Sequence, residues 1–334
     1  MLNFEKLQKK YLSVIEKRLQ QISTDHLSTR GSQLEKIFLY HLGLNEEAKI
    51  GKRIRPLLLL LCNEGAGGDW HQAVPAGAAI ELIHNFSLIH DDIEDKGKVR
   101  RGQLAVWKKW GLAIGVNAGD AMFASAFSEL ANLEQFYPPE IVLESNHLLS
   151  KTCLKLTIGQ QLDLEYESLE KISENDYFRM ITGKTAALLS CSCRMGALLA
   201  GKSEKQQNLF SKFGKNLGLA FQVYDDWLGV WGEPVKTGKS NFSDLLERKK
   251  TLPIIWGIEK STHLLELWEK GINTNQNASR FSIEMIKNGI DKMVIQEAER
   301  LSQESLGYLE KMECNEEIRK ILQQLVSDLI VRDY

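Results

Sequence analysis

The sequence predicts an all-α protein, a single large helical bundle around a central cavity. The 334 residues include six prolines, with none between Pro139 and Pro234 and none after Pro253. Helix interiors exclude proline, and apolar residues recur at three- and four-residue spacing, most clearly over 140–200 and 280–331. Alternating strand patterns with hairpin dipeptides are essentially missing, which excludes a β protein.

Four breaks separate the predicted helices. A glycine-rich turn at 65–69, a charged loop at 96–103, a Pro-Pro pair at 138–139 and a polar loop at 232–244 interrupt the apolar periodicity. None is long or biased enough to be a domain linker. We therefore expect residues 1–334 to form one domain.

Composition excludes several classes of protein. Hydrophobic residues make up 43% and charged residues 26%, and the net charge of −2 attracts neither nucleic acid nor an anionic membrane as a whole. The N-terminus lacks a basic segment followed by an apolar core, and no apolar run approaches the roughly 20 residues of a membrane span. The odd count of five cysteines argues against a disulfide framework. We expect a cytoplasmic protein without a transmembrane segment.

The first acidic cluster is Asp91-Asp92-Ile93-Glu94-Asp95, which follows a nearly apolar helical run over 78–90. On a helix, Asp91 and Asp95 lie one turn apart and face the same way, with Asp92 on the flank. Like charges this close destabilise a bare helix, and a bound divalent cation would relieve the repulsion. A solvated helix end explains this cluster equally well when it is taken alone.

The second acidic cluster, Asp225-Asp226, also ends an apolar helical run, here over 218–224. Basic residues stand around both clusters in short, distinctive settings: Lys52, Arg53, Arg55, Arg100, Arg101, Lys184, Lys239, Lys249 and Lys250. Two sets of carboxylates with this many cations predict a site that grips diphosphates through magnesium.

At this point the motifs resemble those of the trans-isoprenyl diphosphate synthases, the polyprenyl synthetase family. They keep the family's order over roughly 45–255. The matching segments are Gly51-Lys52-Arg53-Ile54-Arg55-Pro56, the first acidic cluster with Arg100-Arg101-Gly102, Gly183-Lys184-Thr185, Gln222-Val223-Tyr224-Asp225-Asp226, and Thr251-Leu252-Pro253.

The resemblance implies a head-to-tail prenyltransferase. An allylic diphosphate would ionise with help from Mg²⁺, three ions per site in the family pattern, and isopentenyl diphosphate would attack the allylic cation. The resemblance also implies a homodimer and a geranylgeranyl (C20) diphosphate synthase-like product, with farnesyl (C15) or longer products as alternatives.

The family pattern also assigns roles to single residues. Isopentenyl diphosphate is expected at Lys52, Arg55, His84 and Arg101, and the allylic diphosphate at Arg100, Lys184, Lys239 and Lys249. Magnesium is expected at Asp91, Asp92, Asp95 and Asp225. The catalytic residues would be Arg100, Lys184, Thr185 and Gln222, the last three lying near the developing cation. Gln160 and Asp163 resemble a polar pair that faces the site in the family.

The chain departs from the family pattern in three places. Gly229 stands where many relatives have a third aspartate, Phe242 replaces a glycine in the loop before Asp244, and Leu104-Ala105 replaces a common Pro-Thr. None removes a primary ligand, although the third magnesium would then depend on Asp225.

Product length is expected to depend on Phe86 and Ser87, which lie five and four residues before Asp91. In the family, a large aromatic followed by a small residue there resembles C20 synthases. Ideal helix geometry turns Phe86 about 140° away from Asp91. Met122, Phe123 and Phe127 are therefore alternative floors of the product tunnel.

Other functions are compatible with parts of the pattern. A terpene cyclase or a squalene-type condensing enzyme would share the first acidic cluster, but neither explains Lys52, Arg55 and Arg101. A non-catalytic regulatory subunit would be expected to lose acidic or basic ligands, and this chain keeps both clusters.

Overall fold

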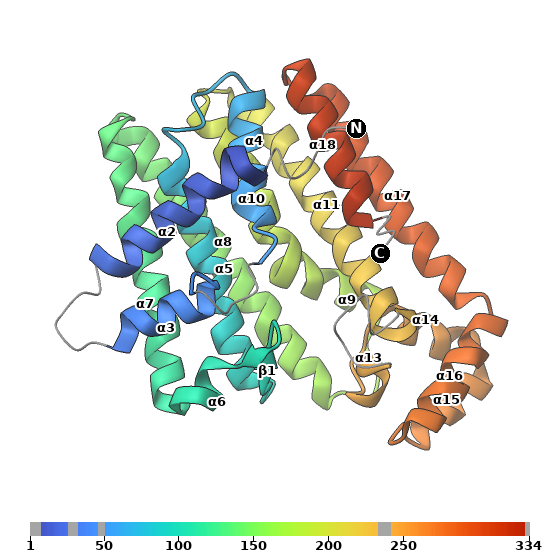
Figure 1. Ribbon diagram of the computed structural model, residues 1–334. Coiled ribbons are helices and arrows are strands. Elements are labelled where there is room, and N and C mark those ends of the chain that lie inside the picture. Colours follow the sequence, from blue (N-terminus) through green and yellow to red (C-terminus); the bar gives the residue numbers. More distant parts are fainter. Residues whose placement is uncertain (1–7, 26–32, 46–50, 233–241, 331–334) are drawn as a thin grey trace. The chain divides into compact units, whose positions relative to one another are not determined.

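The computed structural model describes residues 8–25, 33–45, 51–232 and 242–330. Its order of elements is η1 (Gln8–Leu12), α2 (Ser13–Asp25), α3 (Gln33–Leu42), α4 (Ile54–Gly65), α5 (Val74–Glu94), β1 (Val99–Arg100), β2 (Gln103–Leu104), α6 (Val106–Trp110), α7 (Leu112–Ala131), η2 (Asn132–Gln135), α8 (Pro139–Ser168), α9 (Glu174–Ile181), η3 (Thr182–Ala186), α10 (Ala187–Leu199), α11 (Glu204–Trp231), α13 (Ser243–Leu246), α14 (Leu252–Lys260), α15 (Thr262–Glu269), α16 (Asn275–Lys287), α17 (Ile290–Lys311) and α18 (Glu316–Ile330) (Figure 1). The prediction of an all-α protein is confirmed.

The chain divides into two compact units. The first comprises 1–153, 191–210 and 313–321, and the second comprises 154–190, 211–312 and 322–334. One boundary falls between α17 and α18, and the others fall inside α8, α10, α11 and α18. The expectation of one domain is not tested by this division and stays a prediction.

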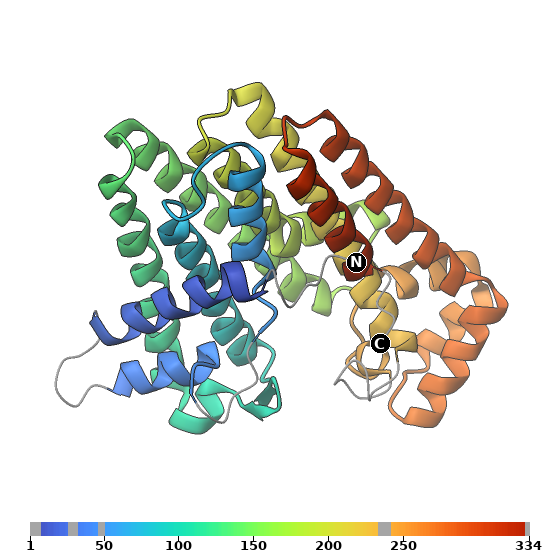
Figure 2. The ribbon, with the colours of Figure 1, turned by 45° about the horizontal axis from the view of Figure 1, so that its top comes forward.

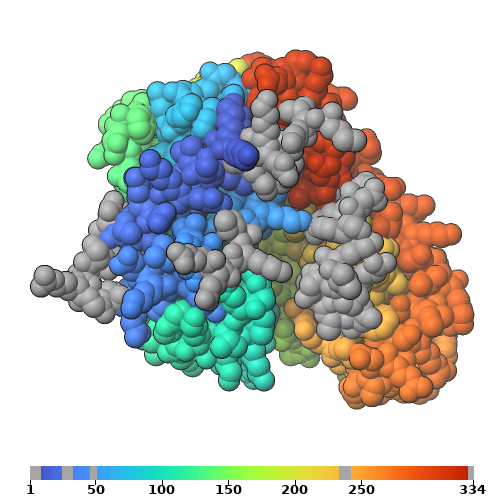
Figure 3. Space-filling model, viewed as in Figure 1, coloured from blue at the N-terminus to red at the C-terminus, as the bar shows by residue number. Residues whose placement is uncertain are grey.

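The core of the first unit is built on α5, which packs against α2, α4 and α7 (Figure 2). Residues 74–83 of α5 are all buried, and so are residues 56–63 of α4. Such continuous apolar runs belong to helices that are covered on several sides. The helices α2 and α3 lie on the outside of this unit (Figure 3).

A short hairpin follows the first acidic cluster, where the sequence predicted only a charged loop. Strands β1 and β2 pair antiparallel, with Arg100 opposite Gln103. The two residues between them, Arg101 and Gly102, have φ angles of 53° and 79°. Left-handed conformations at both central positions are the requirement of a tight two-residue hairpin turn. The turn fixes the directions of the two neighbouring arginines.

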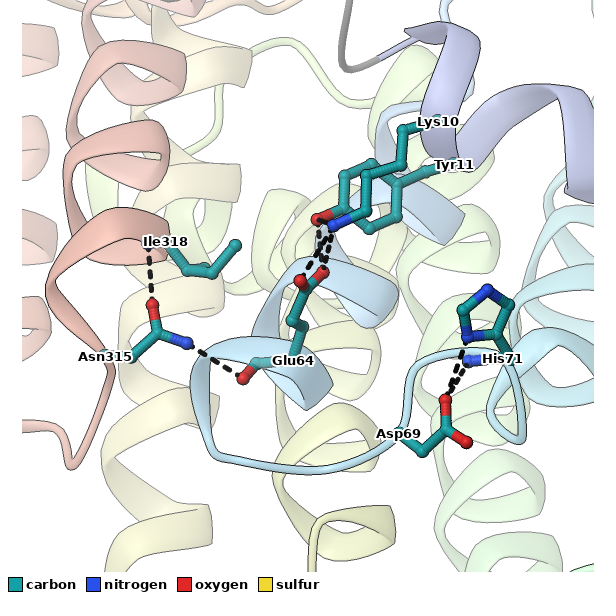
Figure 4. A network of polar contacts seen from close by, with 7 residues as sticks. All are labelled: Lys10, Tyr11, Glu64, Asp69, His71, Asn315 and Ile318. Atoms are coloured by element: carbon teal, nitrogen blue, oxygen red, sulfur yellow. Dashed lines mark hydrogen bonds and ion pairs between the residues drawn. The ribbon is translucent and has the colours of Figure 1, made fainter.

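A polar network ties three distant segments of the first unit together at the end of α4 (Figure 4). The carboxylate of Glu64 accepts hydrogen bonds from Tyr11 and from Lys10, whose Nζ is 2.8 Å from Oε1. The carbonyl of Glu64 accepts from Nδ2 of Asn315 at 3.1 Å, and Oδ1 of Asn315 accepts from the amide of Ile318 at 2.9 Å. Glu64 therefore holds η1 and the start of α18 to α4.

The second unit contains the rest of α8 and most of α11, together with α9, η3 and α13 to α17. Helix α14 packs against α9, α15 and α17, and α16 packs against α15 and α17. Phe213 of α11 is fully buried, and its carbonyl accepts from Ser305 Oγ of α17 at 2.9 Å. The described helices include none that is both long enough and apolar enough to cross a membrane.

Candidate active site

The first acidic cluster lies at the C-terminal end of α5, as predicted. Asp91 is half-buried, Asp92 is buried and Asp95 is exposed. Arg100 on β1 bridges two of them, with Nε 2.8 Å from Oδ2 of Asp92 and Nη2 3.4 Å from Oδ2 of Asp91. Burial raises the pKa of Asp92, and the hydrogen bond from Arg100 opposes that rise. The hairpin therefore places the positive charge of Arg100 against the first acidic cluster.

A basic pocket, defined here as Arg55, His84 and Arg101, lies in the same unit. Nη1 of Arg55 is 3.2 Å from Nε2 of His84. Burial lowers the pKa of His84 well below its usual value, and the charges of Arg55, Arg101, Arg100 and Arg53 lower it further. The imidazole is thus neutral and accepts a hydrogen bond from Arg55, which leaves a concentration of positive charge suited to an anion.

Two further residues complete the surroundings of the basic pocket. A Cβ at Gly51 would lie 2.9 Å from Nη2 of Arg101, so the glycine gives that guanidinium room to lie against the backbone. Nη1 of Arg101 donates to the carbonyl of His41 at 3.3 Å. Lys52 is exposed beside this pocket.

Arg53 has a structural contact that the sequence did not reveal. It is 3% exposed, and its Nη1 donates to Oε1 of Glu81 at 2.7 Å. Nδ2 of Asn85 donates to the same oxygen at 2.7 Å. Because Arg53 has a φ of 50°, its side chain points away from the direction that a helical residue would take. Arg53 therefore anchors the start of α4 to α5, and Arg55 remains the residue on the pocket.

In the second unit, the second acidic cluster is part of a chain of hydrogen bonds. Thr185 Oγ1 donates to Oε1 of Gln222 at 2.7 Å, and Nε2 of Gln222 donates to Oδ1 of Asp226 at 2.8 Å. The hydroxyl of Tyr177 donates to Oδ2 of Asp226 at 2.6 Å. Asp226 is 4% exposed, whereas Asp225 is half-buried. Asp226 thus orients Gln222 and Thr185, and sequence reasoning missed the role of Tyr177.

Lys184 and Thr185 lie on η3, a single π-helical turn between α9 and α10. A Cβ at Gly159 would lie 2.1 Å from the amide nitrogen of Lys184, and one at Gly183 would lie 2.6 Å from the carbonyl oxygen of Lys155. The two glycines therefore let α8 and η3 touch through their backbones. Nζ of Lys184 forms an ion pair with Oδ2 of Asp163 at 2.5 Å. Asp163 is one of the two residues of the expected polar pair, and this contact links it to η3.

The region that departs from the family pattern has its own geometry. Asp244 is 7% exposed, and its Oδ2 would be 2.1 Å from a Cβ at Gly229. Phe242, which stands where the family has glycine, has a φ of 60°. A phenylalanine in this left-handed conformation is strained, and a glycine would not be. Phe242 therefore has a backbone conformation that favours glycine.

For several predicted site residues, the structure does not show whether they meet at one site. Lys239 lies outside the described residues. Lys249 is described, with Nζ 3.3 Å from Oε2 of Glu247. Asp91 belongs to the first unit and Asp225 to the second, so their expected meeting across one cavity stays a prediction.

The expected floor residues lie on different faces of α5. The ring of Phe86 packs edge-on against Phe123 of α7, with centroids 5.1 Å apart. Phe123 in turn contacts Phe127 at 5.1 Å. Ser87 is half-buried and donates to the carbonyl of His84 at 2.8 Å. Phe86 is therefore directed toward α7, and its expected role as the floor of the product tunnel stays a prediction.

Comparison with known proteins decides the family. The polyprenyl synthetase family matches residues 39–287. This chain belongs to the polyprenyl synthetase family. A geranylgeranyl diphosphate synthase of Methanosarcina mazei is 41% identical over 221 residues, which cover 66% of this chain and 67% of that protein. The expected enzyme class, a prenyltransferase, is thereby confirmed.

Two other relatives of this polyprenyl synthetase bear on its product and its fold. A (2E,6E)-farnesyl diphosphate synthase of Mycobacterium bovis is 40% identical over 225 residues, covering 66% of this chain but only 62% of that protein. The solved geranylgeranyl pyrophosphate synthase of Corynebacterium glutamicum, in complex with isoprenyl diphosphate and magnesium, is 25% identical with a TM-score of 0.86, covering 97% of this chain and 99% of that one. A relative named for a geranylgeranyl product and one named for a farnesyl product are therefore almost equally identical to this chain, at 41% and 40%.

The donor atoms of this polyprenyl synthetase fit magnesium. Among the described residues, no three His, Cys, Asp or Glu side chains converge closely enough to hold a metal ion by themselves. Mg²⁺ is usually held by one or two carboxylates, with waters and ligand phosphates completing the octahedron. Asp91 and Asp95, joined by a backbone hydrogen bond of 2.9 Å over one turn, provide such a partial set of oxygen ligands.

Proposed function

We propose that the protein condenses isopentenyl diphosphate with an allylic diphosphate, head to tail, and that geranylgeranyl diphosphate is the product. The observation that carries the proposal is the basic pocket of Arg55, His84 and Arg101 beside the first acidic cluster. The pocket can take one diphosphate by direct charge-assisted hydrogen bonds, and the carboxylates can take another through metal. A reaction between two substrates that each carry a diphosphate needs both of these binding sites.

The first unit would hold isopentenyl diphosphate. Arg55 and Arg101 donate to its oxygens, with Lys52 at the exposed edge. The neutral state of His84 follows from its buried, arginine-rich surroundings, and its hydrogen bond fixes the guanidinium of Arg55. Arg55 is half-buried, and burial lowers its pKa to about 10, so it stays charged at neutral pH. The nucleophilic substrate would be held without competing for the metal.

The allylic diphosphate would be held at Asp91, Asp92, Asp95 and Asp225 through Mg²⁺, with Arg100, Lys184, Lys239 and Lys249 around it. Bound Mg²⁺ would stabilise the negative charge that develops on the departing diphosphate. We expect three Mg²⁺ ions at this site, and the solved relative of Corynebacterium glutamicum is in complex with isoprenyl diphosphate and magnesium. Arg100 already bridges Asp91 and Asp92, so it is positioned to contact a diphosphate leaving group that is held at these carboxylates.

Thr185, Gln222 and the π-turn would stabilise the allylic cation. A π-helical turn interrupts the regular pattern of helical hydrogen bonds, and such turns often occur at functional sites. Oδ1 of Asp226 fixes the amide of Gln222, and Oε1 of Gln222 fixes the hydroxyl of Thr185. These oxygens are therefore oriented before the reaction, which is the condition for effective electrostatic stabilisation. After isopentenyl diphosphate has attacked the allylic cation, a proton must leave, and the departed diphosphate would accept it.

The C20 product rests on Phe86 with its small neighbour Ser87 and on the relative in Methanosarcina mazei. Because Phe86 lies against Phe123 and Phe127, we infer that this aromatic group acts together as the floor. A C15 or longer product is the second candidate, which the farnesyl relative in Mycobacterium bovis favours.

We also propose a homodimer. Apolar side chains are exposed along α7 at Leu112 and Val116 and along α8 at Leu143, which is 72% exposed. Leu112 and Val116 are one turn apart and so lie on one face of α7, and clustered exposed apolar side chains are unusual for a surface left in water. A second copy of this chain would cover these faces.

All five cysteines are free thiols, which agrees with the reducing cytoplasm that we expect.

The test is a product assay. Purified protein is supplied with isopentenyl diphosphate, MgCl₂ and, separately, the C5, C10 and C15 allylic diphosphates, and the products are dephosphorylated and sized. We expect elongation that stops at C20. Accumulation of C15 would support the alternative product, and no elongation with any primer would reject catalysis and favour a regulatory subunit.

A further inference from the structure

The hairpin of β1 and β2 has an inner and an outer face. Arg100 is paired with Gln103 across the strands, and Val99 is paired with Leu104. Successive side chains of a strand point to opposite faces, so the two pairs lie on different sides of the hairpin. The face of Arg100 meets Asp92. Val99 and Leu104 therefore point away from the first acidic cluster, and they are 61% and 49% exposed.

The base of the hairpin is fixed by hydrogen bonds from two aromatic side chains. Nε1 of Trp107 on α6 donates to the carbonyl of Gly97 at 2.7 Å. The hydroxyl of Tyr40 on α3 donates to the carbonyl of Leu104 at 2.9 Å. The hairpin and α6 lie next to each other (Figure 1). Because both bonds hold backbone groups of the hairpin, Val99 and Leu104 stay on its outer face.

The segment that contains the hairpin is strongly basic. Between residues 96 and 119 the sequence has six lysine and arginine residues and no aspartate or glutamate, in a chain whose net charge is −2. Two of the six, Arg100 and Arg101, belong to the proposed substrate site. The other four are exposed lysines, namely Lys96, Lys98, Lys108 and Lys109. Positive charge is therefore concentrated around the hairpin and α6, where it attracts an anionic partner.

Aromatic side chains accompany these lysines. Nζ of Lys109 is 3.8 Å from the ring centre of Tyr40 and 4.7 Å from that of Trp110. Tyr40, Trp107 and Trp110 are all half-buried. Tryptophan, tyrosine and lysine combine an apolar part with a polar end and are typical of the boundary between water and lipid. This composition favours a lipid surface over nucleic acid, whose phosphates need cations but no exposed aliphatic side chains.

We propose that the outer hairpin surface, defined here as Val99 and Leu104 with the four exposed lysines, binds the surface of an anionic lipid bilayer. The aliphatic pair enters the boundary between headgroups and acyl chains, and the lysines contact lipid phosphates. Such binding is peripheral and needs no helix that spans the membrane. A bilayer would also accept the apolar chain of the proposed product, and this consequence alone rests on the proposed function.

The test is co-sedimentation of the purified full chain with vesicles, without substrate or magnesium. One set of vesicles contains equal parts of phosphatidylglycerol and phosphatidylcholine, and the other contains phosphatidylcholine alone. We expect binding to the anionic vesicles that weakens as NaCl is raised, because salt screens the lysines. Equal binding to both sets, or no binding to the anionic set, would overturn the proposal.

Two lysines test the contribution of charge. We expect Lys98→Gln combined with Lys108→Gln to weaken binding to the anionic vesicles roughly 25-fold, or about fivefold for each lysine. Lys205→Gln combined with Lys292→Gln removes two exposed lysines outside this surface and is the charge-matched control. The control should bind as the wild type does. An equal loss in both double variants would show that the attraction is not located at the hairpin.

The aliphatic pair tests the apolar contribution. Val99→Ser combined with Leu104→Ser keeps every charge, and we expect binding to the anionic vesicles to weaken roughly tenfold, since less apolar area leaves water. Ile283→Ser combined with Ile286→Ser is the matched control, because both are exposed aliphatic residues on α16. All four side chains are exposed, so these replacements leave the core intact. Wild-type binding in the hairpin variant would contradict insertion of the pair.

Other occupants of the outer hairpin surface would give different results. A short DNA duplex that binds more tightly than the anionic vesicles, and that the lysine variant releases but the serine variant retains, would replace lipid by nucleic acid. A serine variant that keeps vesicle binding but becomes monomeric in sedimentation equilibrium would assign Val99 and Leu104 to the homodimer instead. Either result would overturn the proposal.

The vesicle assay is independent of the proposed function, because it contains no substrate. If the wild type binds anionic vesicles but elongates no allylic primer, the proposed function is wrong and the lipid surface stands. If the wild type elongates primers but does not bind anionic vesicles, the lipid surface is wrong and the proposed function stands.

Discussion

At the scale of single residues, neighbouring arginines have different tasks because their backbones differ. Arg53 has a positive φ, and its side chain is buried on Glu81. Arg55 lies two residues later, inside α4, and contacts His84. Both were basic residues of one motif in the sequence, where only the resemblance distinguished them. The contact with Glu81 depends on how α4 packs against α5, which local sequence does not reveal.

Replacement of Arg55 by alanine tests the division of the two diphosphates. We expect the KM for isopentenyl diphosphate to rise about tenfold to a hundredfold, because a charged hydrogen bond contributes about 1.5–3 kcal/mol. The KM for the allylic diphosphate should change little. Steady-state kinetics with each substrate varied in turn measures the split, and an equal rise in both constants would contradict the separate pocket.

Replacement of Phe86 by alanine tests the floor of the product tunnel. Removing the ring opens the contact with Phe123, so we expect products longer than C20 at the expense of C20. Product sizing after dephosphorylation gives the distribution. Phe281→Ala, which removes a buried ring in the second unit, controls for a general loosening of the core and should leave the product length unchanged. An unchanged distribution in Phe86→Ala would clear Phe86 of this role.

At the scale of elements, the π-turn depends on the glycines that face it. Gly159→Ala would place a Cβ 2.1 Å from the amide nitrogen of Lys184, and neither backbone can yield without moving η3. We expect a loss of about 1–3 kcal/mol in the free energy of unfolding, as for other overpacked sites. We also expect a lower kcat, because Lys184 and Thr185 would shift.

Chemical denaturation and steady-state kinetics measure both effects of Gly159→Ala. Gly307→Ala is the matched control, since in the described structure a Cβ there meets nothing within 4 Å. A variant with wild-type stability and kcat at position 159 would show that the close approach of α8 and η3 is dispensable.

The network at the end of α4 is also an element-scale feature, because it joins η1 and the start of α18 to α4 (Figure 4). Tyr11→Phe removes one donor to Glu64 and leaves Lys10 in place. We expect a loss of about 1–2 kcal/mol in the free energy of unfolding, within the range for a hydrogen bond to a charged group that is partly exposed. Tyr308→Phe, whose ring contacts Lys212 and Lys311, is the control. Equal denaturation midpoints for the two variants would contradict the role of the network.

At the scale of the whole molecule, exposed apolar faces on α7 and α8 predict assembly. Leu143→Glu introduces a charge on a face that we expect to be covered in a homodimer, and burying an unpaired charge is costly. Sedimentation equilibrium should show a shift toward monomer. Ile286→Glu on α16 is the matched control, because Ile286 is also an exposed apolar residue, at 47%. A monomeric wild type, or a Leu143→Glu variant that remains dimeric, would contradict the proposal.

Sequence reasoning predicted the helical architecture, which the structure confirms, and it named site residues whose roles stay predictions. Both sets of predictions depend on local patterns. Proline scarcity and apolar periodicity predicted the helices, and the spacing of Asp91 and Asp95 predicted carboxylates on one helix face. The contact of Tyr177 with Asp226 could not be predicted in this way, because it joins residues far apart in the sequence.

The central claim is that both acidic clusters serve one diphosphate, although they are far apart in the sequence. The most direct measurement is a crystal structure with Mg²⁺ and an unreactive thio-analogue of an allylic diphosphate. We predict metal ions at about 2.0–2.1 Å from oxygens of Asp91 and Asp95, and another at that distance from Asp225, around the same diphosphate. A diphosphate bound at Asp91 with Asp225 facing a separate surface would contradict the account.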